Sequence, residues 1–432
     1  MTHAFFLLSP LIDTRPFEAM QYFFSILLPT AVMLLILGRW FLEFALSDRA
    51  VEVLTPPELW FLAFLVYMAL FGVLLSVPLM GREILGETGM VKSVKQSIMV
   101  GIAVMFFWVS VRIGRRERLE TVYRALLWTL GALLGYGLLE YLEYVYGVPL
   151  LRPIEYLLHP LKPVSAYGLF SERLRLTTPE PSMAAPYLVI YGLLVLFLRQ
   201  KLGKRGLGVP LLLLAVLVLL LVLGSKGALL SLLLGLFVTT WVATPFLPRR
   251  LGRGRLFWGS LVLFLVLTGL SLVSKTGREL MALSVYENTV LTRAIEMLVG
   301  LKLFVEHPVF GIGAGNLVFY FNDYLNRVGI ISQELFWVLK GLSSDVALGY
   351  KNLFIAVLAE GGLVGFFLFA GFLGSVFRQP LRTLRHDRAG LYLVLIFVFI
   401  LATMMYTDGF NRIYWWIGLG LVAGLSQRFS AP

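Results

Sequence analysis

The sequence predicts an all-α polytopic membrane protein with roughly 11 or 12 transmembrane helices. Hydrophobic residues make up 59% of the chain and charged residues only 14%. A soluble core could not bury that much apolar surface, so the composition indicates an integral membrane protein. The apolar stretches are long enough for helices of roughly 20 residues that cross the hydrocarbon core. They are unlike the short alternating segments of an outer-membrane barrel.

Hydrophobic segments predict where the spans lie along the chain. They fall at about 21–45, 58–80, 97–113, 124–147, 183–199, 209–224, 227–247, 256–273, 352–377, 389–407 and 412–427. The segment Ala4–Ile12 is too short to cross and no small-residue cleavage site follows it, so we expect an interfacial or half-inserted segment rather than a signal peptide.

Basic residues between the spans predict the orientation of the chain. They form four clusters: Arg112, Arg115, Arg116, Arg118 and Arg124; Arg199, Lys201, Lys204 and Arg205; Arg249, Arg250, Arg253 and Arg255; Arg378, Arg382, Arg385 and Arg388. With the spans above, all four fall on one side, which the positive-inside rule makes cytoplasmic together with the C-terminus. The net charge of +12 is therefore explained by topology, without nucleic-acid binding.

Five regions follow from this arrangement. They are N-terminal scaffold helices (1–147), an outer loop (148–181), central helices (182–273), a large outer-face loop domain (274–351) and C-terminal helices (352–432). Loops of such length are more often functional than idle. We therefore expect the large periplasmic or extracellular loop domain, between the spans near 256–273 and 352–377, to form an active-site lid.

Cations recur at the outer ends of the predicted spans, where topology rules disfavour them. They are Arg173, Arg175, Lys226, Arg293 and Lys351. Each alone could snorkel to lipid headgroups, and Arg293 could form a helix-surface ion pair with Glu296. Together they suit an anionic lipid headgroup, above all a phosphate or pyrophosphate, because Arg offers bidentate donors and Lys a compact charge.

Two carboxylates have unusual surroundings. Glu180 stands between Pro179 and Pro181, just before a span. It is either an acid favoured by the helix dipole or a rigid carboxylate that accepts a proton at the mouth of a cavity. Glu360 falls inside an apolar span beside a glycine pair, and we favour a structural role over a place in the site.

The sequence predicts neither a metal nor a cofactor. It has no cysteine, no histidine pair at the i, i+4 spacing of a zinc site and no Asp-x-Asp motif for a sugar-nucleotide metal. Gly224–Gly227 lacks the frame of a Walker motif, and Gly311–Gly315 lacks the spacing of a dinucleotide loop.

Four motifs between about residues 170 and 370 resemble the O-antigen ligase/polymerase superfamily of bacterial membrane glycosyltransferases. They are Pro179–Tyr187 with Arg173 and Arg175 upstream, the turn Gly224–Leu230, the segment from Arg293 to Asn316, and Asn352–Gly365. Their order and spacing carry the resemblance. The chain departs from the family where Lys351-Asn352 replaces the usual His-Asn pair, and Lys226 replaces an arginine.

The resemblance implies a polymerase that joins undecaprenyl-diphosphate-linked repeat units at the outer face of the bacterial cytoplasmic membrane. The implied diphosphate-binding residues are Arg173, Arg175, Lys226, Arg293, Lys351 and Asn352. Arg293 and Lys351 would also stabilise the leaving group, and Glu180 would be the base or position the acceptor. No metal or nucleotide is implied, because the diphosphate is already an activated leaving group.

Two alternatives stay open. An O-antigen ligase would transfer the glycan to lipid A–core from the same donor site, and a lipid-linked sugar transporter would show charged or broken spans at mid-membrane. The implied partners are the lipid-linked glycan and membrane lipids, with room for a chain-length-regulating co-polymerase.

Overall fold

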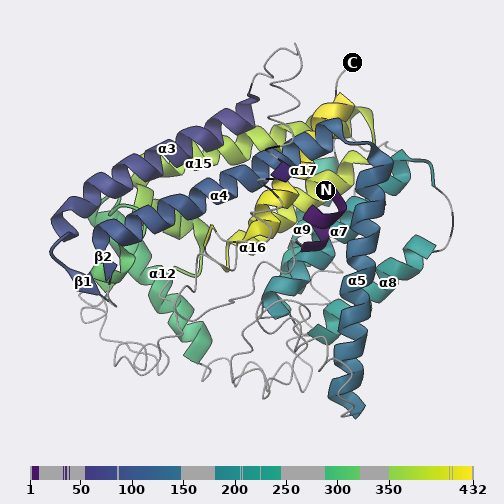
Figure 1. Ribbon diagram of the computed structural model, residues 1–432, viewed down its shortest axis with the longest axis horizontal. Coiled ribbons are helices and arrows are strands. Elements are labelled where there is room, and N and C mark those ends of the chain that lie inside the picture. The colour runs from purple at the N-terminus through teal and green to yellow at the C-terminus, as the bar shows by residue number, and fades with distance from the viewer. Residues whose placement is uncertain are drawn as a thin grey trace.

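The computed structural model of the chain is built almost entirely from helices (Figure 1), which confirms the predicted all-α membrane fold. It describes residues 2–8, 33, 35–36, 38, 54–84, 87–146, 181–204, 206, 208–223, 225–244, 288–321, 350–407, 409–410 and 412–430.

The helices of the N-terminal half are α1 (Thr2–Leu8), α3 (Pro56–Ser76), α4 (Gly89–Arg116) and α5 (Leu119–Tyr146). A short 3-10 turn (Val77–Leu79) and a two-stranded antiparallel pair, β1 (Glu83–Ile84) and β2 (Glu87–Thr88), connect α3 to α4, with Glu83 opposite Thr88. The later helices are α7 (Pro181–Lys201), α8 (Gly208–Leu223), α9 (Lys226–Ala243), α12 (Asn288–Glu306), α15 (Leu353–His386), α16 (Gly390–Met404) and α17 (Ile413–Ser430).

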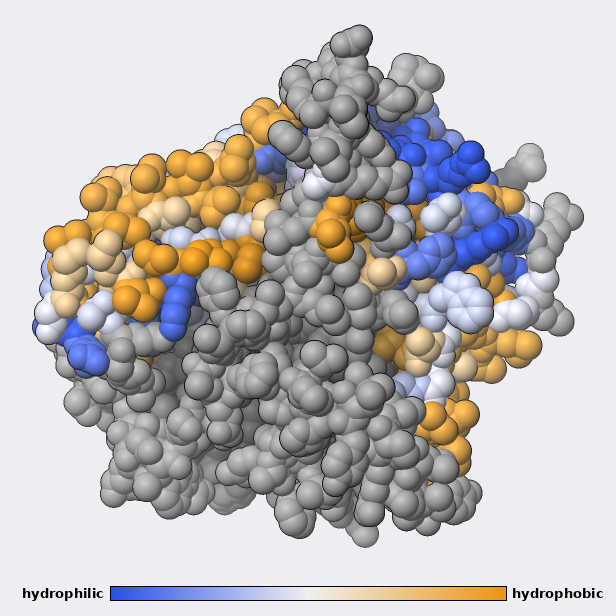
Figure 2. Space-filling view, viewed as in Figure 1, coloured by the Kyte–Doolittle hydropathy of each residue, from blue (hydrophilic) through white to orange (hydrophobic). Residues whose placement is uncertain are grey.

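Several described helices are long and apolar enough to cross a membrane. They are Pro56–Leu79, Gly89–Arg116, Leu119–Glu143, Ala184–Lys201 and Leu353–His386, and shorter apolar helices lie at Gly208–Leu220, Gly227–Ala243 and Gly390–Met404. Figure 2 shows a continuous hydrophobic surface over α3, to which exposed Val66, Leu70 and Leu74 contribute. Such a face suits contact with lipid.

Two predicted spans are not tested by the structure. The span 256–273 and nearly all of 21–45 lie outside the described residues.

The segment Ala4–Ile12, which we expected at the membrane interface, lies elsewhere. Its described part belongs to α1, which packs against α5. Phe5 and Phe6 on α1 are fully buried, against Phe106 and Tyr191, so this part lies among the helices.

Small residues bring α17 and α4 into close contact at the centre of the bundle. A Cβ on Gly420 would lie 2.4 Å from the Phe107 carbonyl oxygen, and one on Gly424 would lie 2.3 Å from that of Val111. Helices in membranes associate through such close packing of small residues. Next to this contact, Phe61 stacks on Phe372 with ring centroids 4.1 Å apart.

The long helix α15 is broken at Gly362. Its φ of 62° and ψ of −162° belong to a region open essentially to glycine alone. A break inside an apolar helix frees backbone groups that need partners, and the turn 307–316 supplies them. The hydrogen bonds run from Ile312 N to Ala359 O (2.9 Å), Gly313 N to Glu360 O (3.0 Å), Leu363 N to Pro308 O (2.8 Å) and Val364 N to Val309 O (3.2 Å).

The same turn is anchored to α3. Asn316 is fully buried, and its Nδ2 donates to Ser76 Oγ at 3.0 Å and to the Ile312 carbonyl at 2.9 Å. Tyr67 Oη donates to the Gly361 carbonyl at 2.7 Å, beside the break. The backbone of Glu360 thus takes part in the docking of the turn and its side chain is buried, which fits the structural alternative for this residue.

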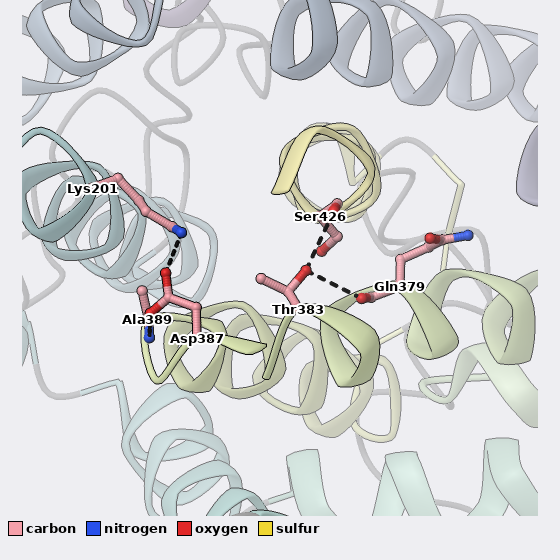
Figure 3. Close-up of polar contacts among 6 residues, drawn as sticks. All are labelled: Lys201, Gln379, Thr383, Asp387, Ala389 and Ser426. Atoms are coloured by element: carbon pink, nitrogen blue, oxygen red, sulfur yellow. Dashed lines mark hydrogen bonds and ion pairs between the residues drawn. The ribbon is translucent and has the colours of Figure 1, made fainter. Parts of the chain in front are cut away.

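One end of the bundle is held together by paired charges. Figure 3 shows Lys201, at the end of α7, facing Asp387 in the α15–α16 connection, and Thr383 donating to the Ser426 carbonyl of α17. Lys204 Nζ lies 2.7 Å from Glu120 Oε1 on α5. These contacts bring the first, second and fourth predicted basic clusters to one end, here called the basic end. The cluster at 249–255 lies outside the described residues.

Candidate functional site

Three helices begin beside one short turn, Met405–Tyr406, which directly follows α16. Asn352, the N-cap of α15, donates from Nδ2 to the Met405 carbonyl at 2.9 Å. Gly227, in the first turn of α9, lies under the Tyr406 ring, and a Cβ there would be 2.8 Å from ring carbons. Trp415, in the first turn of α17, donates from Nε1 to Thr403 Oγ1 near the end of α16 at 2.8 Å. The starts of α9, α15 and α17 therefore lie at the end of the helix bundle that is opposite the basic end.

A cation stands at each of these three helix starts. Lys226 is the first residue of α9, Lys351 precedes the N-cap of α15, and Arg412 precedes α17. The positive end of a helix dipole disfavours cations and favours anions. Lys351 and Arg412 therefore stand at helix starts where the local dipole would favour a bound anion.

Arg293 reaches the same turn from α12. Its Nη1 donates to the Tyr406 carbonyl at 3.4 Å, and its Nε is buried without a hydrogen-bond partner among the described residues. The alternative of a surface ion pair between Arg293 and Glu296 does not fit the structure, because Glu296 is fully buried and its Oε1 lies 3.8 Å from Lys351 Nζ.

Lys351 is held in an uncommon backbone conformation. Its φ is 50°, in the left-handed region that residues other than glycine seldom adopt. Its Nζ lies 3.8 Å from Glu296 Oε1, and the Lys351 side chain remains 26% exposed. Such conformations persist where the surrounding structure enforces them, often at functional sites. Tyr350, next to it, packs on α12 at Gly300, where a Cβ would lie 2.6 Å from its ring.

Asn352 has a structural role in this arrangement. Its Oδ1 accepts from Phe354 N at 2.9 Å and from Ile355 N at 3.1 Å, which caps α15. Its Nδ2 joins the cap to Met405. The amide that the resemblance assigns to diphosphate binding is therefore engaged in fixing the helix start beside Lys351.

Tyr406 was missed by the sequence reasoning. Burial raises the pKa of Tyr406 to about 12, while Ser231, Arg293 and Arg412 act in the opposite direction. The phenol is therefore protonated at physiological pH, and its hydroxyl is a hydrogen-bonding group rather than a base. No motif singles out this tyrosine. The available sequence signal was its position six residues before Arg412, the residue that precedes α17.

The remaining predicted residues are placed only in part. Arg173, Arg175 and Glu180 lie outside the described residues, and of Lys226 only the backbone is placed, as the start of α9. α7 begins at Pro181, directly after Glu180. The structure thus brings together Arg293, Lys351, Asn352 and the Lys226 backbone. Within the described part of the chain, no three His, Cys, Asp or Glu residues are grouped as metal ligands.

A family model described as O-Antigen ligase matches residues 210–370, less than half of the chain. The matched segment contains most of α8, all of α9 and α12 and the first part of α15, and so includes Lys226, Arg293 and Lys351. The match supports the resemblance to the O-antigen ligase/polymerase superfamily. At the family level it supports a membrane glycosyltransferase of the ligase/polymerase type. No curated protein matches the sequence.

Proposed function

Starting from this superfamily, we propose that the chain is a polysaccharide polymerase that uses undecaprenyl-diphosphate-linked oligosaccharide repeat units. The observation that carries the proposal is that Arg293 and the starts of α9, α15 and α17 meet around Met405–Tyr406, with Lys351 directly before the N-cap of α15. A diphosphate is the membrane-bound anion that such a region suits, because it accepts several charged hydrogen bonds at once.

The reaction needs the cations mainly as the leaving group departs. An acceptor hydroxyl on a second lipid-linked repeat attacks the anomeric carbon of the donor. The bond from that carbon to the diphosphate oxygen breaks, its electron pair stays on the diphosphate, and the hydroxyl proton passes to a base. Arg293 and Lys351 stabilise the charge that develops on the diphosphate, as preorganised cations do in a site that excludes water. We assign the base, or the positioning of the acceptor, to Glu180.

Arg173 and Arg175 would bind the diphosphate from the outer loop, together with Lys226. We place the site at the periplasmic face of the cytoplasmic membrane, since the basic end carries the cations of the positive-inside rule. The lipid-linked donor would then reach the site from the outer leaflet.

The ligase alternative is favoured by one observation, the description O-Antigen ligase of the matched family. It requires the same donor site and a different acceptor, lipid A–core.

The transporter alternative gains less from the structure. α15 is broken at Gly362, but the turn 307–316 fills the break with backbone hydrogen bonds, so the interruption is a docking point rather than an open ion or sugar site.

The test uses the purified full-length protein and a lipid-diphosphate-linked oligosaccharide as the only substrate, with products separated on a gel. A ladder of lengthened lipid-linked glycan is the expected result. Arg293→Ala should reduce its rate about 100-fold or more, the scale of losing a transition-state charge contact. The matched control Arg124→Ala removes a paired arginine at the basic end and should leave the ladder unchanged.

The other outcomes decide between the alternatives. Transfer only after addition of lipid A–core would replace polymerase with ligase. Binding of the donor with neither product would overturn the proposed glycosyltransferase and favour transport.

A further inference from the structure

We propose that α12 is an interfacial helix whose exposed apolar face contacts the acyl chains of the lipid leaflet at the end of the bundle opposite the basic end. This face, here called the apolar stripe, consists of Ala294, Leu298, Leu301 and Val305. The inference goes beyond the proposed function and does not depend on it, because its test uses no substrate.

One side of α12 is buried against the protein. Ile295, Val299 and Leu303 recur every four residues and are almost completely buried. They belong to one cluster with Ile312 of the turn 307–316 and Ala359 of α15. This side therefore holds α12 to the broken part of α15.

The apolar stripe runs along the opposite side of the same helix. Its members follow one another at intervals of three and four residues, so they form one line on the helix surface. Leu298 is 53% exposed, Leu301 41% and Val305 71%. A helix that faces water on one side carries charged residues in such a line, whereas none of these four residues is polar. The composition of the stripe therefore favours an apolar partner.

The apolar surface continues from α12 onto α3. Directly after the helix, Val309 and Phe310 are exposed, and the Phe310 ring stacks on Phe71 of α3, with centroids 5.1 Å apart and an interplanar angle of 11°. Leu70 and Leu74, on either side of Phe71 in the chain, belong to the exposed hydrophobic surface of α3. That surface suits contact with lipid, and lipid is therefore the partner that the stripe shares with it.

The direction of α12 suits the surface of a membrane rather than a crossing of it. Figure 1 shows α12 running across the direction of α3 and α15, two helices long and apolar enough to span. By helical spacing, Arg293 and Lys302 stand at the two borders between the buried side and the apolar stripe, and both are half-buried. Long cationic side chains at the borders of an apolar face are typical of helices that lie at the level of the headgroups.

The absence of cysteine from the sequence makes this proposal directly testable. Single cysteines at Leu298, Leu301 and Val305 would each carry a nitroxide label in the full-length protein, held in nanodiscs of phosphatidylethanolamine and phosphatidylglycerol. Collision of the label with oxygen, which concentrates in lipid, is compared with collision with a water-soluble nickel chelate. The expected result is a ratio of oxygen to nickel collisions several-fold higher at all three positions than for a label in water.

Three control positions calibrate the measurement. Leu70→Cys on the exposed surface of α3 gives the value for lipid, and Arg124→Cys at the basic end, where the arginine side chain is 66% exposed, gives the value for water. Val299→Cys on the buried side of α12 should be reached by neither reagent. Gel filtration of each labelled protein shows that it is folded, and three positions on the stripe allow one to be lost.

A second measurement uses no label. Leu301→Glu keeps a good helix former but places a carboxylate in the stripe, so it should lower the unfolding temperature in nanodiscs by several degrees. Leu301→Met is the matched control and should unfold like the wild type. An unchanged unfolding temperature in Leu301→Glu would contradict contact with lipid.

The other outcomes identify a different partner of the stripe. Nickel collisions as frequent as in Arg124→Cys would place the stripe in water and overturn the proposal. Protection from both reagents, as expected for Val299→Cys, would mean that protein covers the stripe, either another part of this chain or a second copy, and would overturn it as well. Neither result would bear on the proposed polymerase, whose test is the gel assay.

Discussion

The two ends of the helix bundle both gather cations, but they hold them in different ways. At the basic end, several contacts pair a cation with a carboxylate on another element, as in Lys201 with Asp387 and Lys204 with Glu120. At the opposite end, Arg293 donates to the Tyr406 carbonyl, and Lys351 and Arg412 stand at the starts of α15 and α17. The first arrangement joins helices, and the second concentrates positive charge.

The difference shows that residue type alone does not assign a role to an arginine. Paired cations at helix C-termini, such as Lys201 on α7, are favoured by the helix dipole as well as by their partners. Cations at the starts of α9, α15 and α17 oppose the dipole. For Lys351 the structure shows one compensating partner, the carboxylate of Glu296, whose Oε1 lies 3.8 Å from Nζ.

The largest effect is expected at the break in α15, which supports the end of the bundle where the candidate site lies. Gly362→Ala should lower the free energy of unfolding by more than about 2 kcal/mol and abolish transfer, because the backbone there is nearly closed to other residues. The new Cβ would also lie 2.3 Å from the Val309 carbonyl oxygen and push the turn 307–316 away. Thermal unfolding in detergent and the gel assay measure the two effects.

Gly374→Ala is the matched control on the same helix. A Cβ at Gly374 meets nothing within 4 Å, and alanine favours a helix more than glycine does. Its unfolding temperature should be equal or higher. Wild-type stability in Gly362→Ala would show that the break does not depend on the glycine backbone.

A smaller effect is expected from Glu296, a buried carboxylate that pairs with Lys351. Glu296→Gln keeps the volume of the side chain but removes the charge opposite Lys351 Nζ, so the ammonium is held less firmly. We expect kcat for transfer to fall about 10-fold, which corresponds to about 1.4 kcal/mol. Steady-state kinetics with the lipid-linked donor measure this change.

The comparison for this variant is Glu306→Gln at the exposed end of α12, which should keep wild-type kcat. If both variants had the same kcat, the Glu296–Lys351 pair would have no part in the reaction.

The sequence predicted the helices of the bundle well, because long apolar runs and basic clusters are signals that a membrane enforces along the chain. It could not predict the docking of the turn 307–316 on the broken α15. Gly361 and Gly362 indicated close packing, but the partner depends on backbone groups of Pro308 to Gly313, which no side-chain pattern reports. The burial of α1 was missed for a similar reason, since a short apolar segment suits an interface and a helix interior equally.

The candidate site was predicted in part. Arg293 and Lys351 stood out because they oppose the topology rule, and the structure brings both to one turn. Asn352 was expected to bind the ligand, yet the same residue type caps helices, and that is its role in the structure. Tyr406 could not be chosen from the sequence, because its relation to Arg293 and Gly227 arises only when α9, α12 and the end of α16 pack together.

The smallest effect is expected at the basic end, and it depends on pH. Burial disfavours the charged form of Asp387, but the Lys201 ammonium and the Ala389 amide outweigh this cost and lower the pKa of Asp387. A carboxyl with a lowered pKa in the folded state stabilises the fold above its unfolded pKa of about 4 and loses that contribution as the pH falls through the folded pKa. Asp387→Asn should therefore cost at most about 1 kcal/mol at neutral pH, and the difference from wild type should shrink below about pH 4.

Unfolding of the wild type and the variant at a series of pH values measures this difference, with transfer assayed at neutral pH. Lys201→Gln should give the same loss, and the double variant should lose little more than either single one, because the two side chains act as a pair. Transfer should be unaffected in all three, since the pair joins helices far along the bundle from Tyr406. Loss of transfer in folded Asp387→Asn would mean that the two ends of the bundle are coupled, and the separation of their roles would have to be abandoned.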